Sequence, residues 1–162
     1  DLYGLLADVA NHAGEWAAKT EITLNLDCNP DAGPFLADQR RMRQIVFNLL
    51  SNAFKYTPRG GTVRLSGRIL GEDVQIAVAD NGPGLAPDVK ANVFERFSAQ
   101  NRSSGHAGAG LGLALVNRFA ELHGGWVEIE SDDGTLVRCH LPRHRKAGDA
   151  ARQEKAGRVA YP

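Results

Sequence analysis

One predicted helix carries a row of polar side chains that could hold a hydrated metal ion and a polyphosphate together. Asn48 and Asn52 are four residues apart, and Lys55 follows three residues later. At about 100° per residue these three side chains and Gln44 fall within a sector of roughly 80°. Amide oxygens and an ammonium suit this task, because Mg²⁺ keeps several waters and needs few protein oxygens. A solvated helix face is the simpler explanation of such a row, so the row alone decides little.

A glycine-rich segment, Asp80-Asn81-Gly82-Pro83-Gly84, directly follows an expected strand. Glycines at Gly82 and Gly84 permit positive φ and let another group approach the backbone closely. The Asp80 carboxylate at this point could accept a hydrogen bond from an exocyclic amine such as that of adenine. The same five residues also make a good turn, and both interpretations remain open here.

A second glycine-rich segment, Gly108-Ala109-Gly110-Leu111-Gly112, opens a later predicted helix. Backbone N–H groups at the positive end of a helix form an anion site. A dinucleotide-binding fold is disfavoured, because a polar loop precedes this segment where that fold requires a strand. A Walker-type phosphate loop is excluded, because no Gly-Lys-Ser/Thr follows.

The polar segment 98–109 follows two aromatic residues, Phe94 and Phe97, and leads into the second glycine-rich segment. We expect the two aromatic side chains to anchor the start of this segment to the core. An anchored, glycine-rich stretch before a phosphate-facing helix is what a substrate lid requires. An ordinary surface loop is the alternative, although this segment is long for one.

The pattern of apolar residues predicts the elements that must position these groups. Asp38 is a good N-cap for the strongest predicted helix, over 38–55. The other expected elements are helices over 1–18, 87–93 and 110–123 and strands over 21–27, 62–70, 74–79, 126–131 and 135–141. The order in which helices and strands alternate predicts a two-layer α+β sandwich.

Two of these helices carry apolar residues along one side. In the helix over 38–55 the stripe consists of Met42, Ile45, Val46, Leu49, Leu50 and Ala53. In the helix over 110–123 we expect Leu111, Leu115, Phe119 and Leu122 to share one side. Both patterns follow the period of an amphipathic helix.

Composition sets the broad class of the protein. The chain has 162 residues, 43% of them hydrophobic, and 19 Lys and Arg against 19 Asp and Glu. The balanced charge gives no argument for nucleic acid or an anionic membrane as partner. No apolar run approaches the roughly 18 residues of a membrane span. We expect one domain over 1–142 and a disordered tail over 143–162, which is poor in core-forming residues.

The two cysteines, Cys28 and Cys139, are far apart in the sequence and have no metal-type spacing. We interpret both as small hydrophobic residues in or near the core. Their spacing does not suggest a disulfide framework. This indicates a reducing, cytosolic setting.

The four motifs, taken in their order along the chain, resemble those of the catalytic and ATP-binding domain of bacterial sensor histidine kinases. This domain belongs to the superfamily shared with gyrase and heat-shock chaperone ATPases (GHKL). The segment from Asn48 to Pro58 is similar to the family's N box, and Asp80–Gly84 to its first glycine box. Phe94–Phe97 is similar to the F box and Gly108–Gly112 to the second glycine box. The resemblance covers residues 1–142 and implies a mixed, mostly antiparallel sheet packed against about three helices.

The resemblance also implies roles for individual residues. Asn52 would ligate Mg²⁺ with Asn48 beside it, and Lys55 would touch phosphate. Tyr56 would pack near the adenine of ATP, and Asp80 would bind its amino group. The remaining residues implied to bind the nucleotide are glycines of the two boxes and one leucine: Gly82, Gly84, Gly108, Gly110, Leu111 and Gly112.

Asn48 distinguishes between branches of this superfamily. The gyrase and chaperone branch has at this position a Glu that activates water, and an Asn has no useful basicity. The resemblance therefore implies transfer of the γ-phosphoryl of ATP to a histidine, and disfavours hydrolysis. Family members carry that histidine on a dimerisation hairpin, and no histidine of this chain has the required sequence context.

The resemblance further implies partners and location. The hairpin of the same parent protein and a response regulator would be the partners, and nucleic acid would not. The isolated domain would be a monomer and its parent a homodimer. The domain would be cytoplasmic, and the sequence leaves open whether the parent is anchored in the inner membrane.

One segment departs from the family pattern. After Phe97 the family often has an aromatic residue and then an Arg that helps to hold the γ-phosphate, whereas this chain has Ser98-Ala99-Gln100. Arg96 or Arg102 could substitute for that Arg. A degenerate pseudokinase, which regulates a partner protein with weak or no phosphotransfer, is therefore the alternative hypothesis.

Overall fold

The computed structural model describes residues 1–91 and 111–144. A five-stranded sheet has the order β1-β2-β3-β5-β4. The strands are β1 (Thr23–Cys28), β2 (Thr62–Leu70), β3 (Asp73–Asp80), β4 (Trp126–Glu130) and β5 (Thr135–Pro142). Strands β1 and β2 pair in parallel, and the other neighbours pair antiparallel. The predicted mixed, mostly antiparallel sheet is confirmed.

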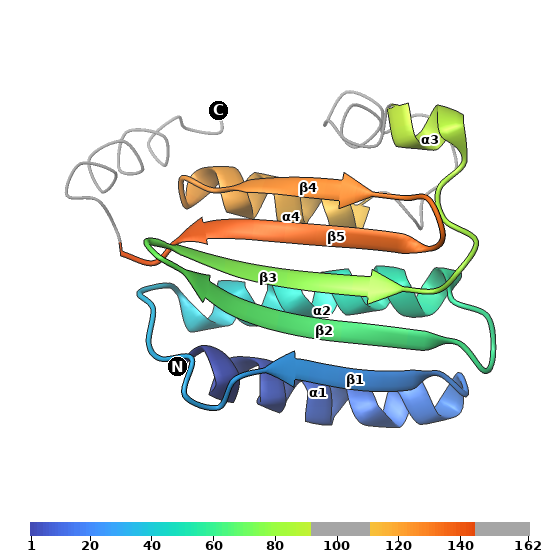
Figure 1. Cartoon of the computed structure of the whole chain (residues 1–162), viewed down its shortest axis with the longest axis horizontal. Helices are drawn as coiled ribbons and strands as arrows, with labels where there is room; N and C mark the ends of the chain where they lie inside the picture. The colour runs from blue at the N-terminus through green and yellow to red at the C-terminus, as the bar shows by residue number, and fades with distance from the viewer. Residues whose placement is uncertain (92–110, 145–162) are drawn as a thin grey trace, which may run out of the picture.

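Three long helices cover one face of this sheet (Figure 1). They are α1 (Leu2–Lys19), α2 (Gln39–Tyr56) and α4 (Leu111–Leu122), and the short α3 (Pro87–Ala91) follows β3. Helix α2 lies between α1 and α4 and contacts both. The predicted two-layer α+β sandwich is therefore confirmed.

Side chains at the helix ends account for where α2 begins and ends. The Asp38 carboxylate accepts a hydrogen bond from the Arg41 N–H at 3.1 Å, which confirms Asp38 as the N-cap. At the other end the Thr57 N–H donates to the Ala53 carbonyl at 2.9 Å. The Thr57 hydroxyl donates to the same carbonyl at 2.7 Å. These bonds satisfy backbone groups that a helix end otherwise leaves unpaired.

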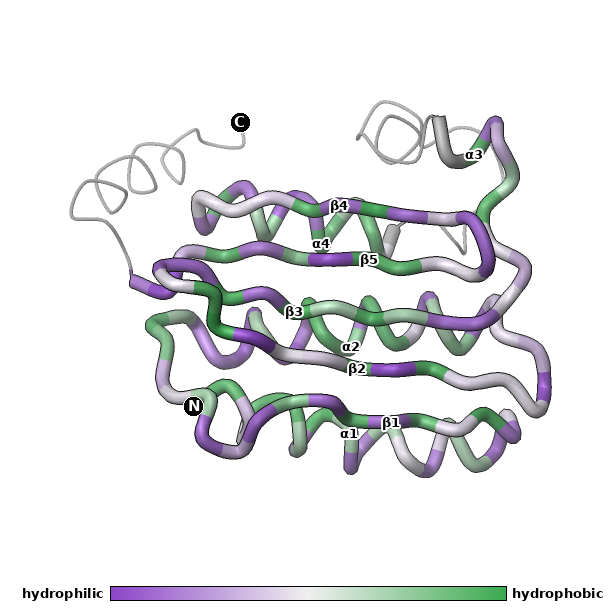
Figure 2. Tube along the Cα trace, viewed as in Figure 1, coloured by the Kyte–Doolittle hydropathy of each residue, from purple (hydrophilic) through white to green (hydrophobic). Residues whose placement is uncertain are grey.

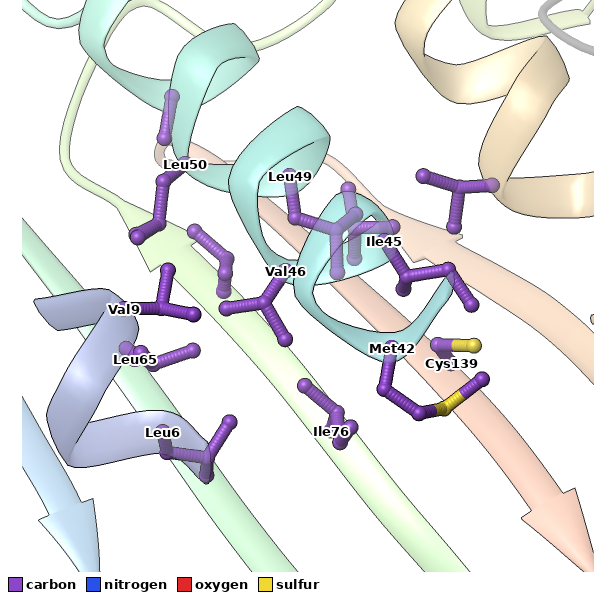
Figure 3. Packing of buried hydrophobic residues seen from close by; sticks show 14 of the residues in the cluster. Leu6, Val9, Met42, Ile45, Val46, Leu49, Leu50, Leu65, Ile76 and Cys139 are labelled. Carbon is purple, nitrogen blue, oxygen red and sulfur yellow. The ribbon is translucent and has the colours of Figure 1, made fainter. Parts of the chain in front are cut away.

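The core lies between the three helices and the sheet (Figure 3). All six residues of the predicted α2 stripe are buried, and Phe54 is buried with them. Residues of α1, β2, β3 and β5 complete the core, among them Leu6, Val9, Leu65, Ile76 and Cys139. Burying one such side chain contributes about 1.5–3 kcal/mol. Along the strands, hydrophobic and hydrophilic residues alternate (Figure 2), as expected of a sheet with one buried face.

Of the apolar side predicted for α4, Phe119 packs against the core, but the fully buried residues of this helix are others. Leu113, Val116 and Ala120 face the core, whereas Leu115 is 39% exposed. The helix is apolar around most of its circumference, so its sequence offers two stripes with helical spacing. Packing against α2, β4 and β5 selects the stripe that contains Val116.

Both cysteines are free thiols. Cys139 is fully buried, and this burial raises its pKa to about 12. Cys28 is partly exposed, and burial also raises the pKa of its thiol. We expect iodoacetamide at about pH 8 to modify Cys28 slowly and Cys139 only after denaturation, because the thiolate is the reactive form. Peptide mass spectrometry checks this, and equal labelling of both thiols in the folded chain would contradict it.

Candidate nucleotide-binding site

A pocket lies between the C-terminal half of α2, the end of β3 and the start of β5. Four predicted site residues line it: Asn52 and Tyr56 from α2, Asp80 from β3 and Gly84 from the loop after β3. The space between these elements is about 600 Å³, a volume that includes solvent at the open mouth. Segments far apart in the sequence therefore supply one site.

The walls of this pocket are mostly apolar. Leu49 and Ala53 come from α2, and Val78 and Val137 from the sheet. Leu85, Val89 and Leu113 complete the apolar lining. A flat aromatic base fits such walls, provided that a few polar groups fix its orientation.

Asp80 supplies one such polar group. It ends β3, and its Oδ1 accepts a hydrogen bond from the Gly82 N–H at 2.9 Å. Thr135 lies opposite Asp80 in the β3–β5 register and also lines the pocket. Burial raises the pKa of the Asp80 carboxyl, and backbone hydrogen bonds from Gly82 and Thr135 oppose this shift. The carboxylate is held in place and can accept a further hydrogen bond from a ligand.

The raised pKa of Asp80 makes stability depend on pH in a defined direction. The folded chain holds the Asp80 proton more tightly than the unfolded chain, so this group costs stability as pH rises through its folded pKa. An asparagine side chain cannot ionise, so the stability of the Asp80→Asn variant relative to the unchanged chain should rise between about pH 4 and pH 7. Urea unfolding of both chains over this range checks the prediction. A difference that stays constant or falls with pH would show that burial does not set the pKa of this carboxyl.

The polar side chains in the row along α2 differ in burial. Asn48 and Asn52 are half-buried, whereas Gln44 and Lys55 are exposed and do not line the pocket. The Lys55 ammonium lies 5.8 Å from the centre of the Tyr56 ring. Lys55 therefore contacts a residue that lines the pocket, whereas among the described residues no contact of Gln44 with the pocket lining is seen.

The N-terminal end of α4 lies against the two asparagines. A Cβ on Gly112 would lie 3.6 Å from Asn52 Oδ1 and 3.7 Å from the Asn48 carbonyl oxygen. The last glycine of the second glycine box thus faces the N box, as a shared phosphate site requires. Gly108, Gly110, Phe94, Phe97, Arg96 and Arg102 lie outside the described residues, as does segment 98–109, and Leu111 is described only by its backbone.

The residues present fit a nucleotide with its Mg²⁺. The Asn48 Nδ2 atom is buried and has no hydrogen-bond partner among the described residues. A buried amide group without a partner is costly unless a ligand supplies one. The described residues contain no cluster of three or more His, Cys, Asp or Glu for a metal. Mg²⁺ that keeps its waters and phosphate ligands does not need such a cluster, and the Asn48 and Asn52 amides offer protein oxygens.

Two residues that support the site were missed in the sequence. Gly134 has φ +92°, and a Cβ there would lie 2.0 Å from the Asp80 carbonyl oxygen. Ser131 is buried, and its Oγ accepts a hydrogen bond from the Leu85 N–H at 2.6 Å. Both lie at the β4–β5 turn, where Asp-Asp-Gly is a sufficient turn signal by itself. Only the contact across the sheet reveals their connection to the first glycine box.

Comparison with known families gives one match over most of the chain. The family model described as histidine kinase-, DNA gyrase B- and HSP90-like ATPase matches residues 37–145. This range contains every predicted site residue. It also contains the pocket and the β4–β5 turn.

Curated relatives are bacterial sensor proteins and kinases. Sensor protein DivL of Caulobacter vibrioides is 39% identical over 88% of this chain and 19% of its own length. Adaptive-response sensory kinase SasA of a Synechococcus strain is 37% identical over 75% of this chain and 33% of its own length. The chain thus spans a third or less of these two relatives.

Solved structures show the same fold. The catalytic domain of histidine kinase ThkA superposes with a TM-score of 0.77 at 24% identity, covering 90% of this chain and 94% of that one. Full-length ShkA in complex with AMPPNP has a TM-score of 0.72 at 35% identity, covering 90% of this chain and 31% of that one. Among the described residues, no helix has the length and apolarity needed to cross a membrane.

Proposed function

Because the chain belongs to the family of histidine kinase-, DNA gyrase B- and HSP90-like ATPases, we propose that it binds ATP with Mg²⁺ and donates the γ-phosphoryl to a histidine on the dimerisation hairpin of its parent protein. The observation that carries this proposal is the pocket shared by Asn52, Tyr56, Asp80 and Gly84. These residues come from two separate sequence motifs and surround one apolar cavity with a fixed carboxylate.

The base end of ATP would lie between the apolar walls. The Asp80 carboxylate would accept a hydrogen bond from the exocyclic amine of adenine, and Tyr56 would pack beside the ring. Gly82 and Gly84 would keep the backbone close to the base, and a Cβ on Gly82 would already lie 3.0 Å from the Tyr56 carbonyl oxygen. These contacts select an aromatic base that carries an amine donor.

The phosphate end would lie toward α4. Asn52, with Asn48 beside it, would hold Mg²⁺, and Lys55 would approach a phosphate. Bound Mg²⁺ would neutralise charge on the phosphates during transfer. Gly108, Gly110, Leu111 and Gly112 would let the lid and the first turn of α4 approach the phosphates. The buried Asn48 amide without a described partner supports a ligand at this end.

The described lining of the pocket has no second carboxylate that could activate water, and this favours transfer of the γ-phosphoryl over hydrolysis. Asp80 is the single carboxylate among the described lining residues, and Gly82 and Thr135 already donate backbone hydrogen bonds to it. Asn48 cannot take a proton from water. A nucleophile supplied by another domain is therefore the better match for this pocket.

The proposal includes partners and a location. The dimerisation hairpin of the parent would present the histidine, and a response regulator would receive the phosphoryl group. A structure similar in fold, at 21% identity and a TM-score of 0.75, is that of histidine kinase ThkA in complex with response regulator protein TrrA. The domain would work in the cytoplasm, as a monomer when isolated and as part of a homodimer in its parent.

Calorimetry tests the binding half of this proposal. Titration of the chain with ATP in excess Mg²⁺ should show affinity in the micromolar range, about 8 kcal/mol of binding free energy. Removal of Mg²⁺ with a chelator should weaken it. Absence of any binding heat and of any thermal stabilisation by ATP would contradict the proposal.

One observation favours a second candidate function. Ser98-Ala99-Gln100 replaces the aromatic residue and Arg that often follow the F box. A pseudokinase that regulates a partner protein would bind ATP weakly or normally and transfer little or no phosphate. Binding without transfer to the hairpin would identify this candidate.

A further inference from the structure

One buried hydroxyl connects the β4–β5 turn to Leu85, the residue that follows the first glycine box. Ser131 is 8% exposed and, with Thr57, is one of two buried polar side chains in the described part of the chain. Its Oγ accepts from the Leu85 N–H at 2.6 Å and donates to the Gly134 carbonyl at 3.3 Å. The hydroxyl thus links two loops separated by 46 residues.

The hairpin does not need the bond to Leu85. A Ser hydroxyl that bonds a carbonyl three residues later is a local turn interaction, and the bond to Gly134 fulfils it. The bond to Leu85 instead satisfies a backbone donor in the loop between β3 and α3. The residues between Asp80 and Pro87 form neither helix nor strand, so this loop obtains its position from such long-range contacts.

Close packing reinforces this connection. Gly84 has φ +75°, and a Cβ there would lie 2.9 Å from Ser131 Oγ and 3.2 Å from the Gly134 carbonyl oxygen. Gly134 in turn lies directly against the Asp80 backbone. The first glycine box and the β4–β5 turn therefore pack as one unit, at the same edge of the sheet (Figure 1).

The residues held by this unit form one wall of the pocket. Gly84 and Leu85 line it directly, whereas Ser131 does not line it. We propose that Ser131 is a positioning residue for nucleotide binding, whose hydroxyl holds the Gly84–Leu85 backbone and so sets the affinity for the base of the nucleotide. This inference rests on the proposed binding of ATP.

Removal of the hydroxyl should weaken binding without unfolding the chain. In Ser131→Ala the Leu85 N–H loses its acceptor, and the wall it holds can move. We expect about tenfold weaker binding of ATP with Mg²⁺ and a similar factor for adenosine, because the wall faces the base. Ser131→Thr keeps the hydroxyl and should stay within about threefold of the unchanged chain.

A matched control separates positioning from general stability. The Thr20 hydroxyl is also partly buried and donates to the carbonyls of Trp16 at 2.9 Å and Ala17 at 3.1 Å, at the far end of α1. Thr20→Ala removes a comparable hydroxyl away from the pocket and should leave affinity unchanged. Amide hydrogen exchange at Leu85 in the nucleotide-free chain should be faster in Ser131→Ala than in Thr20→Ala.

Calorimetry on the four chains, with NMR titration for adenosine, decides the inference. Weaker binding by Ser131→Ala alone, with faster exchange at Leu85, supports it. Unchanged affinity in Ser131→Ala would overturn it while the proposed function stands, and so would equal losses in Ser131→Thr or in Thr20→Ala. Absence of ATP binding by the unchanged chain would overturn the proposed function, and this inference with it.

Discussion

The Asn52→Ala variant is expected to bind ATP with Mg²⁺ far more weakly than the unchanged chain. Asn52 is half-buried and lines the pocket, and its Oδ1 faces the start of α4 at Gly112. Loss of an amide oxygen from a charged ligand site costs about 2 kcal/mol or more, which lowers affinity roughly 30-fold or further. Because the side chain is not part of the apolar core, thermal unfolding without nucleotide should change little.

Asn117→Ala is the matched control for this variant. Asn117 lies on α4, and its amide donates a hydrogen bond to the exposed side chain of Glu121 at 3.0 Å. It does not line the pocket, so its removal should leave nucleotide affinity unchanged. Calorimetry of both variants checks the prediction. Equal affinity in Asn52→Ala and the unchanged chain would remove Asn52 from the site.

Gly134→Ala should have the largest effect on stability. Its φ of +92° is strained for alanine, and the added Cβ would lie 2.0 Å from the Asp80 carbonyl oxygen. Backbone atoms on both sides cannot move away cheaply, so we expect a loss of about 3–5 kcal/mol. This is a large part of the roughly 5–15 kcal/mol that stabilises a domain. The melting temperature should fall by roughly 10 °C.

Gly71→Ala isolates the steric part of this effect. Gly71 has φ +64°, and a Cβ there would meet no atom within 4 Å. We expect a loss of only about 1 kcal/mol, the cost of the left-handed conformation. Urea unfolding of the two variants measures the difference. Similar losses in both would mean that the β4–β5 turn does not pack tightly against Asp80.

Most of the fold could be predicted from local signals in the sequence. Asp38 marks the start of α2, and the apolar stripe that follows it fixes the buried face. Helix α4 was harder, because Leu115 and Val116 lie on two overlapping apolar stripes. Only the packing partners decide which stripe is buried, and these partners come from other parts of the chain.

The structure brings together some of the residues proposed for the site and leaves others apart. Asn52 and Asp80 were proposed from separate motifs, and the structure brings them to one pocket. Gln44 has the correct helical spacing and yet is exposed outside the pocket. Helical periodicity gives the direction of a side chain, whereas the neighbouring elements decide whether it lines a site.

The sequence contains no signal that distinguishes the residues supporting the pocket wall from ordinary turn residues. Gly134 and Ser131 fit a hairpin turn, and that local explanation is sufficient for both. Their contacts with Asp80 and Leu85 depend on the pairing of β3 with β5. A contact between residues 46 positions apart cannot be inferred from spacing alone.

The most direct test of the proposed function follows the γ-phosphoryl of ATP. The chain is incubated with the dimerisation hairpin of its parent protein, Mg²⁺ and ATP labelled at the γ-phosphate. We predict label on the hairpin, in the acid-labile form expected of phosphohistidine, and no transfer with Asn52→Ala. Label that appears only as free phosphate would contradict the proposal and identify the chain as an ATP-hydrolysing enzyme.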